Sequence, residues 1–197
     1  MPQLGQIDNS QGQFCRALVA LGGNAASPAG PPAATVRAAM AAVADLGRAA
    51  RCSPLFTTPA FPAGAGPDFV NAAMAFETRL APEALLAELH AIEARFGRER
   101  LARWGMRSLD LDLLALDGLI LPDLAGWSAW RDLAPERQAR EAPDRLILPH
   151  PRLQDRAFVL VPLCEVAADW RHPATGLSVR AMRDALPEAD RAAVRPL

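Results

Sequence analysis

The sequence GRERLARWGMRSLDLDLLAL, residues 97–116, is the stretch on which the interpretation of this chain depends. From Leu109 onward the residues alternate, so a β-strand would place Asp110 and Asp112 on one face and leucines on the other. The Cα atoms of the two aspartates would lie roughly 6.5–7 Å apart, close enough to serve two divalent cations roughly 3.5–4 Å from each other. The preceding loop contains Trp104 and four arginines: Arg98, Arg100, Arg103 and Arg107. Arginines beside such a site suggest a ligand rich in phosphate.

Two interpretations of the aspartate pair remain open at this point. Ionised carboxylates on a leucine-rich strand are costly unless they are paired or bind a metal. Hard oxygen ligands without converging His or Cys favour magnesium, which takes its other ligands from water and from substrate phosphates. The competing interpretation is salt bridges to Arg98, Arg103 or Arg107. No Gly-rich phosphate-binding loop is present, so arginines and metal ions would have to hold any nucleotide.

The composition argues against several classes of protein. The 197 residues are 51% apolar and 22% charged, and the net charge of -1 argues against nucleic acid or an anionic membrane as the main partner. The 3 cysteines are widely spaced and support neither a disulfide framework nor a zinc motif. The N-terminus lacks a secretory pattern, and no apolar run approaches the ~20 residues of a membrane span. We therefore expect a single domain in a reducing cytoplasm.

The elements around residues 97–116 follow from hydrophobic periodicity. Apolar residues at helical spacing between Pro82 and Gly97 predict a helix that leads directly into the charged loop. A second helix is predicted between Pro32 and Gly47. Strands are predicted at residues 16–21, 51–57, 69–78 and 109–116. The resulting order predicts an α+β fold, a ferredoxin-like α/β sandwich with a mainly antiparallel central sheet and helices on both sides.

Glycines mark two further positions. Gly22-Gly23-Asn24 follows the first predicted strand, where we expect either a plain strand-to-helix turn or a turn with positive φ at which the backbone approaches a ligand. Gly47 is expected to cap the C-terminus of the first helix.

The long connection at about residues 117–145 is interpreted as an insertion in a domain spanning residues 15–197, preceded by a flexible tail at residues 1–14. It is expected to contain one short amphipathic helix, which ends before Pro135. The apolar residues that predict this helix lie three apart: Leu124, Trp127, Trp130 and Leu133. A surface helix laid over the core is the favoured interpretation, and a lid or a dimer contact is the alternative. Deletion of residues 126–141 is expected to leave turnover largely intact.

Single polar residues give further candidates. Asn71 lies in an otherwise apolar strand, where its amide either makes a strand-edge hydrogen bond or reads the edge of a heterocycle. His150 lies between two prolines that fix its backbone, and arginines follow closely. His90 and His172 are expected to be surface or capping residues.

With these residues in view, the chain resembles the hydroxymethyldihydropterin pyrophosphokinase family of folate biosynthesis over most of residues 16–180. Four blocks match in order: VALGGN; SPLFTTPAF followed by PDFVNAAMAFET; IEARFGRERLARWGMRSLDLDLLAL; and LILPHPRLQDRAFVLVPLCEVA. The resemblance implies transfer of the β,γ-diphosphate of ATP to the hydroxymethyl oxygen of 6-hydroxymethyl-7,8-dihydropterin, with release of AMP. It also implies two Mg2+ ions.

The resemblance further implies roles for individual residues. The metal ligands would be Asp110 and Asp112, which with Arg98 and Arg107 would form the catalytic group. Phe69 and Phe158 would sandwich the pterin, Trp104 and Arg107 would close over the site, and three residues would read the edge of the ring: Asn71, Thr58 and Pro59. The implied ATP contacts are Glu93, Arg98, Arg100, Trp104, Ile147, His150 and Arg156.

The sequence departs from the family pattern in four places. The family commonly has GSN at residues 22–24 and WGPR where this chain has WGMR with Met106. The arginine loop is one residue shorter than in some members, and the 117–145 connection is longer than usual. We expect a cytoplasmic monomer that binds neither nucleic acid nor membranes. The alternatives are a ferredoxin-like binding module that has lost catalysis and a magnesium-dependent nucleotide hydrolase.

Overall fold

A computed structural model of the chain describes residues 13–60, 66–97, 107–134, 137 and 140–197. The elements follow in the order β1 (Cys15–Gly23), α1 (Pro32–Ala44), β2 (Arg48–Cys52), β3 (Phe56–Thr58), β4 (Phe69–Thr78), α2 (Pro82–Arg95), β5 (Asp110–Leu116), α3 (Leu124–Arg131), η2 (Leu153–Asp155), α5 (Ala157–Ala167), α6 (Val179–Ala185), α7 (Glu188–Ala192) and β6 (Arg195–Pro196). The predicted tail at residues 1–14 lies almost entirely outside the described residues.

The strands form one sheet in the order β5-β1-β4-β3-β6, and β2 also pairs with β4. Each named pairing is antiparallel. Two strand-helix-strand units, one through α1 and one through α2, therefore interleave in the sheet, which is the ferredoxin-like connection. The predicted α+β sandwich is confirmed.

The strand predicted at residues 51–57 is in fact two strands, β2 and β3, separated by residues 53–55. Ser53 interrupts the ladder because its hydroxyl, rather than a backbone carbonyl, accepts a hydrogen bond from the Ala73 N–H at 2.9 Å. Pro54 follows and has no N–H to donate. The spacing of apolar residues in the sequence does not predict a break of this kind.

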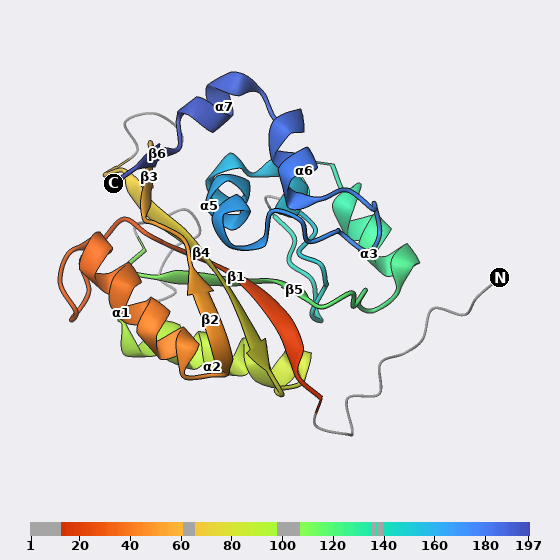
Figure 1. Cartoon of the computed structure of the whole chain (residues 1–197), viewed down its shortest axis with the longest axis horizontal. Helices are drawn as coiled ribbons and strands as arrows, with labels where there is room; N and C mark the ends of the chain where they lie inside the picture. The colour runs from red at the N-terminus through yellow and green to blue at the C-terminus, as the bar shows by residue number, and fades with distance from the viewer. Residues whose placement is uncertain (1–12, 61–65, 98–106, 135–136, 138–139) are drawn as a thin grey trace.

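Helices cover both faces of the sheet (Figure 1). One core lies between the sheet and helices α1 and α2, and it takes Ala17, Val19 and Leu21 from β1. The other lies under α5 and α6 and takes Leu18 and Ala20 from the same strand. The alternating apolar residues of β1 thus supply both cores, which is why this strand reads as continuously hydrophobic.

The predicted alternation of β5 holds through its first half. Leu111 and Leu113 are buried in the core on the α1 and α2 side, whereas Asp110 and Asp112 are partly exposed on the opposite face. The register with β1 then shifts at Leu114, so this residue and the next both face the α5 core. This bulge separates a half of β5 that carries carboxylates from a half that is wholly apolar.

Neither predicted role of glycine in backbone conformation holds at Gly23 or Gly47. The positive-φ glycines of the described chain are Gly30, Gly97 and Gly176. Gly23 belongs to β1, and a Cβ there would lie 2.4 Å from the Ser108 carbonyl oxygen; a Cβ on Gly47 would lie 2.1 Å from that of Glu77. These glycines are needed because another backbone segment passes too close for a side chain.

The insertion contains the predicted short helix, α3, which ends before Pro135. Asp123 caps it by accepting a hydrogen bond from Gly126 N at 2.7 Å. The prediction for His172 was wrong: it is fully buried, with its ring 4.9 Å from Trp127 and 5.8 Å from Trp170. No helix among the described residues is long and apolar enough to span a membrane.

Candidate functional site

A row of residues crosses the sheet at one end of its α5 face. Asp110 on β5 is opposite Gly22 on β1, and Gly22 is opposite Asn71 on β4. Asp112 is opposite Ala20, whose side chain belongs to the α5 core. Since neighbouring strands lie about 4.8 Å apart, the Cα atoms of Asp110 and Asn71 are separated by roughly 10 Å. Gly22 contributes no side chain to that interval, and a Cβ there would lie 2.9 Å from Asn71 Oδ1, so the Asn71 amide lies over this glycine.

Both carboxylates are paired with arginines. Arg107 forms an ion pair with Asp110, and Arg156 Nη1 lies 3.4 Å from the Oδ2 atom of Asp112. The salt bridge from Arg107 was part of the competing interpretation, whereas Arg156 was not among its arginines. The aspartate side chains are 26% and 33% exposed, so an approaching ligand can reach them.

Residues 150–156, which precede α5, form a wall beside Asp112 that we call the cationic wall after Arg156. Arg156 immediately precedes α5, and burial lowers the pKa of its guanidinium while the Asp112 carboxylate opposes that shift. His150 lies near the same charges. Burial lowers its pKa to about 4, against the raising effect of Asp112. Its imidazole is therefore neutral at physiological pH.

The tautomer of His150 follows from its hydrogen bond. Its Nδ1 atom accepts from the Arg152 backbone N–H at 3.1 Å, so in the neutral ring the proton resides on Nε2. The wall thus offers a neutral N–H donor beside the guanidinium of Arg156.

The residues assigned to the pterin lie at the other end of the row. Asn71 is buried, and its Nδ2 atom donates to Thr58 Oγ1 at 2.7 Å. Phe69 lies two residues before Asn71 on the same face of β4. Phe158, in the first turn of α5, is 41% exposed and has Arg156 Cζ 5.8 Å from its ring centroid. Pro59 follows Thr58 and is exposed.

The remaining predicted contacts divide into two groups. Glu93 is buried on α2, where its Oε1 atom accepts from Leu111 N at 2.7 Å, and Ile147 is buried just before His150. Glu93 therefore supports the first half of β5 directly. The other predicted residues, Arg98, Arg100 and Trp104, lie outside the described residues, as does Met106.

Asn24 is a residue whose role sequence reasoning missed. Its Oδ1 atom accepts from Arg107 N at 2.9 Å, and its Nδ2 atom donates to the Pro67 carbonyl at 3.2 Å. Its own N–H donates to Arg107 O at 2.9 Å. Asn24 thus joins the segments that lead into β4 and β5. The GGN sequence was the available signal, but it pointed to glycine conformation rather than to the amide.

The donor set suits magnesium better than a softer metal. Within the described part of the chain, no group of three or more His, Cys, Asp and Glu side chains converges to hold a metal. Asp110 and Asp112 are a pair of hard oxygen donors beside cationic groups that can meet phosphates. Such a pair is the protein's usual contribution to a magnesium ion that is otherwise bound by water and phosphates.

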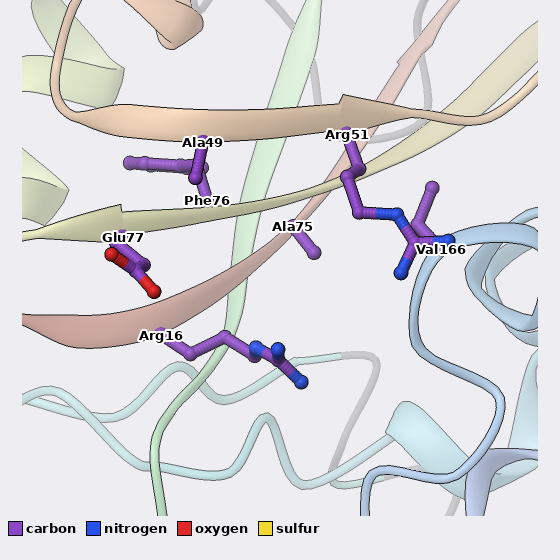
Figure 2. A pocket seen from close by; sticks show the side chains of 7 residues that line it. All are labelled: Arg16, Ala49, Arg51, Ala75, Phe76, Glu77 and Val166. Carbon is purple, nitrogen blue, oxygen red and sulfur yellow. The ribbon is translucent and has the colours of Figure 1, made fainter.

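A separate pocket of about 140 Å³ lies near the other end of the sheet (Figure 2). It is lined by Arg16, Ala49, Arg51, Ala75, Phe76, Glu77 and Val166. None of the predicted site residues lines it, so the candidate site is the row between Asp110 and Asn71 and not this pocket.

The α+β fold and a row of carboxylates paired with arginines are typical of one class of protein, enzymes that act on phosphate-bearing substrates. The sequence model of the 7,8-dihydro-6-hydroxymethylpterin-pyrophosphokinase (HPPK) family matches residues 18–168. A 2-amino-4-hydroxy-6-hydroxymethyldihydropteridine pyrophosphokinase of Synechocystis sp. is 38% identical over 165 residues, which cover 83% of this chain and 72% of that protein. The protein of the same name from Pseudomonas aeruginosa is 40% identical over 160 residues, which cover 80% and 84%.

Solved structures share the fold. Wild-type Plasmodium falciparum HPPK-DHPS matches with a TM-score of 0.58 and 12% identity, covering 89% of this chain and 45% of that chain. The present chain thus spans less than half of that solved chain, and this likeness concerns the fold alone. The chain belongs to the HPPK family. Membership confirms the predicted family and the predicted enzyme class, a pyrophosphokinase of folate biosynthesis with ATP as a substrate.

Proposed function

We propose that this chain transfers the β,γ-diphosphate of ATP to the hydroxymethyl oxygen of 6-hydroxymethyl-7,8-dihydropterin at the row between Asp110 and Asn71. The observation that carries the proposal is the row itself, in which the Cα atom of Asp110 lies roughly 10 Å from that of the buried Asn71 across Gly22, with Asp112 on the same face. A triphosphate at one end and a flat heterocycle at the other would then share one face of the sheet.

We assign Asp110 and Asp112 to two magnesium ions. When bound there, magnesium would neutralise the phosphate charge that develops during the transfer. The arginine pairs need not compete with this assignment in the complex, because the phosphates would give Arg107 and Arg156 charge-assisted, bidentate partners in place of the carboxylates. Their release from Asp110 and Asp112 would leave the carboxylate oxygens to the metal. The same arginines would then hold the diphosphate.

The cationic wall would position the transferred group. His150 would donate from Nε2 to a phosphate oxygen as a neutral ring, and Arg156 would add charge beside it. Arg98 and Arg100 are proposed to contact phosphates from the loop before β5, with Glu93 and Ile147 near the nucleotide. Phosphoryl transfer needs little covalent help from protein groups, so positioning and charge carry most of the catalysis.

The amide end would recognise the pterin. Because Asn71 Nδ2 is already bonded to Thr58, its position is fixed before the ligand arrives. Its carbonyl oxygen would accept from the pterin, and backbone groups at Thr58 and Pro59 would read the rest of the edge. Phe69 and Phe158 would stack on the two faces of the ring, and Trp104 would close the site with Arg107.

A product assay tests the proposed reaction. ATP, magnesium and the hydroxymethyl pterin should together give AMP, whereas omission of the pterin should give none. Asp110→Ala and Asp112→Ala should each lower turnover by at least 100-fold, because each removes a metal ligand. Turnover close to wild type in these variants would contradict the metal assignment. Release of phosphate or diphosphate into water would indicate the hydrolase, and binding without any product would indicate the binding module.

We propose further that residues 15–197 act as one pyrophosphokinase domain, monomeric and cytoplasmic. The three cysteines of the described residues are unbridged, as expected for a reducing compartment. Size-exclusion chromatography at working concentrations tests the monomer.

A further inference from the structure

The insertion meets the candidate site through one side chain. Trp127 on α3 is 1% exposed, and its indole Nε1–H donates to the Pro149 carbonyl at 2.8 Å. That carbonyl belongs to the residue immediately before His150. The contact therefore links the insertion, for which the family resemblance implies no role, to the cationic wall.

The backbone around His150 depends on partners outside its own segment. Pro149 and Pro151 have no N–H, so the segment cannot build regular hydrogen bonds of its own. His150 N donates to Leu114 O at 2.8 Å on β5, on the side of the sheet. Trp127 supplies the hydrogen bond to the Pro149 carbonyl. The peptide that carries His150 is thus held between β5 and α3.

Trp127 is itself fixed on several sides. The His172 ring packs 4.9 Å from it, and Arg131 Cζ lies 5.1 Å from its ring centroid. Just before α3, Leu121 and Leu148 exchange backbone hydrogen bonds of 2.8 Å and 3.2 Å, which ties the start of the insertion to the same segment. A buried indole with this packing has one accessible position, so its N–H acts as a fixed reference point for the Pro149 carbonyl.

We infer that Trp127 is a positioning residue for His150, and through it for the phosphate end of the bound nucleotide. This inference rests on the proposed function. It also replaces the expectation that residues 126–141 are dispensable, because deletion of that range would remove Trp127 and leave a buried carbonyl without its donor. The insertion therefore acts neither as a lid nor only as a surface cover: through Trp127 it fixes the backbone next to His150.

The test is a Trp127→Phe variant, which keeps an aromatic ring and removes the N–H. We expect the KM for ATP to rise about ten-fold, a loss of roughly 1.4 kcal/mol in nucleotide binding, while the KM for the pterin changes less than two-fold. Trp130→Phe is the matched control, because Trp130 lies on the same helix, is partly exposed, and has no hydrogen bond from its indole to any described residue. Equal effects of the two substitutions would overturn the inference.

A double-mutant cycle separates positioning from simple stability. If Trp127 acts through His150, Trp127→Phe should have little further effect on the KM for ATP in a His150→Gln background. Full additivity of the two substitutions would overturn the inference. Should the Phe variant fail to fold, Trp127→Tyr takes its place in the cycle, because its hydroxyl is displaced from the position of the indole N–H that reaches Pro149. The KM for ATP should then rise in the wild-type background and change little in the His150→Gln background. A rise of equal size in both backgrounds, or no rise in either, would overturn the inference.

A readout without turnover keeps the inference distinct from the proposed function. The chain has 3 histidines, and 15N NMR of their imidazoles reports tautomer and environment directly. Trp127→Phe should shift the signals of His150. It should also shift those of His172, whose ring packs against Trp127, while His90 serves as an internal reference. If wild-type protein makes no AMP and these shifts still occur, the proposed reaction fails and the positioning role stands. Unshifted His150 signals would overturn the positioning role whatever the activity.

Discussion

At the scale of single residues, the glycines show how backbone packing sets the position of the carboxylates. A Cβ on Gly23 would lie 2.4 Å from the Ser108 carbonyl oxygen, two residues before Asp110. A side chain there must push the start of β5 away from β1. Gly23 is therefore a steric requirement of the site rather than a flexible turn.

The substitution Gly23→Ala should destabilise the fold by about 1–3 kcal/mol, the usual cost of overpacking, and should lower kcat because Asp110 moves. Gly118→Ala is the matched control, since a Cβ there meets no atom within 4 Å; its effect should stay within about 1 kcal/mol. Urea unfolding gives both values. A Gly23→Ala protein as stable as the Gly118→Ala protein would show that the contact with Ser108 relaxes freely.

At the scale of elements, Asn24 joins two loops that no local pattern connects. Its amide holds Arg107 N and Pro67 O, so one side chain sets the distance between the entries to β5 and β4. Those strands carry the carboxylates and Asn71 respectively. The spacing of the strand ends that carry these candidate site residues consequently depends on this amide.

We expect Asn24→Ala to lower kcat/KM for both substrates by about 10-fold to 100-fold, because two hydrogen bonds worth about 1–1.5 kcal/mol each are lost. Asn24→Asp keeps the acceptor for Arg107 N but not the donor to Pro67, and it should fall between the Ala variant and wild type. Steady-state kinetics with each substrate varied in turn decides the point. An Ala variant with unchanged kcat/KM would remove Asn24 from the functional site.

At the scale of the whole molecule, a buried histidine couples stability to pH. Burial lowers the pKa of His172 to about 4 from an ordinary 6.5. The unfolded chain thus binds a proton on this ring below about pH 6.5 and the folded chain only below about pH 4, so stability falls as pH falls through that window. His172 alone should lower the free energy of unfolding by about 2 kcal/mol between about pH 7.5 and about pH 5.

Urea unfolding of wild type and His172→Gln across that range measures this contribution. The variant should be less stable at neutral pH but should show a flatter dependence on pH. His150 has a similarly lowered pKa and is present in both proteins, so its effect cancels in the comparison. Parallel curves for wild type and His172→Gln would contradict the assignment.

The sequence predicts the secondary structure of this protein best where apolar residues recur with a regular period. The alternation of leucines predicted that Asp110 and Asp112 lie on one face of a strand. The helical spacing of apolar residues before Gly97 predicted α2, because burial of one face of an element imposes these periods. The helix within the insertion was found in the same way. Contacts between distant segments leave no periodic signal. Neither the Gly23 approach to Ser108 nor the amide bridge of Asn24 could be predicted from local pattern, since the partners lie 43 or more residues away in the chain.

The sequence also gives no sign of the roles of His172 and Trp127. A lone histidine in HPATG suggests a surface residue, and a tryptophan in the insertion suggests a surface helix laid over the core. Only their mutual packing and the contact with Pro149 give them a role. The roles of Phe69, Phe158 and the arginines came from the family resemblance, because stacking partners and phosphate contacts have no signature of their own in a single sequence.

The position of β5 at the edge of the sheet has a consequence for the protein in crowded surroundings. An edge strand with open N–H and C=O groups is a template on which other chains add strands and aggregate. Here the Glu93 carboxylate accepts from the N–H of Leu111, and the His150 N–H donates to the carbonyl of Leu114, so two backbone groups of this edge are already bonded within the protein. These bonds disfavour the addition of a foreign strand along the edge that carries Asp110 and Asp112. Loosening of the segment around His150 would free the Leu114 carbonyl and should therefore lower solubility.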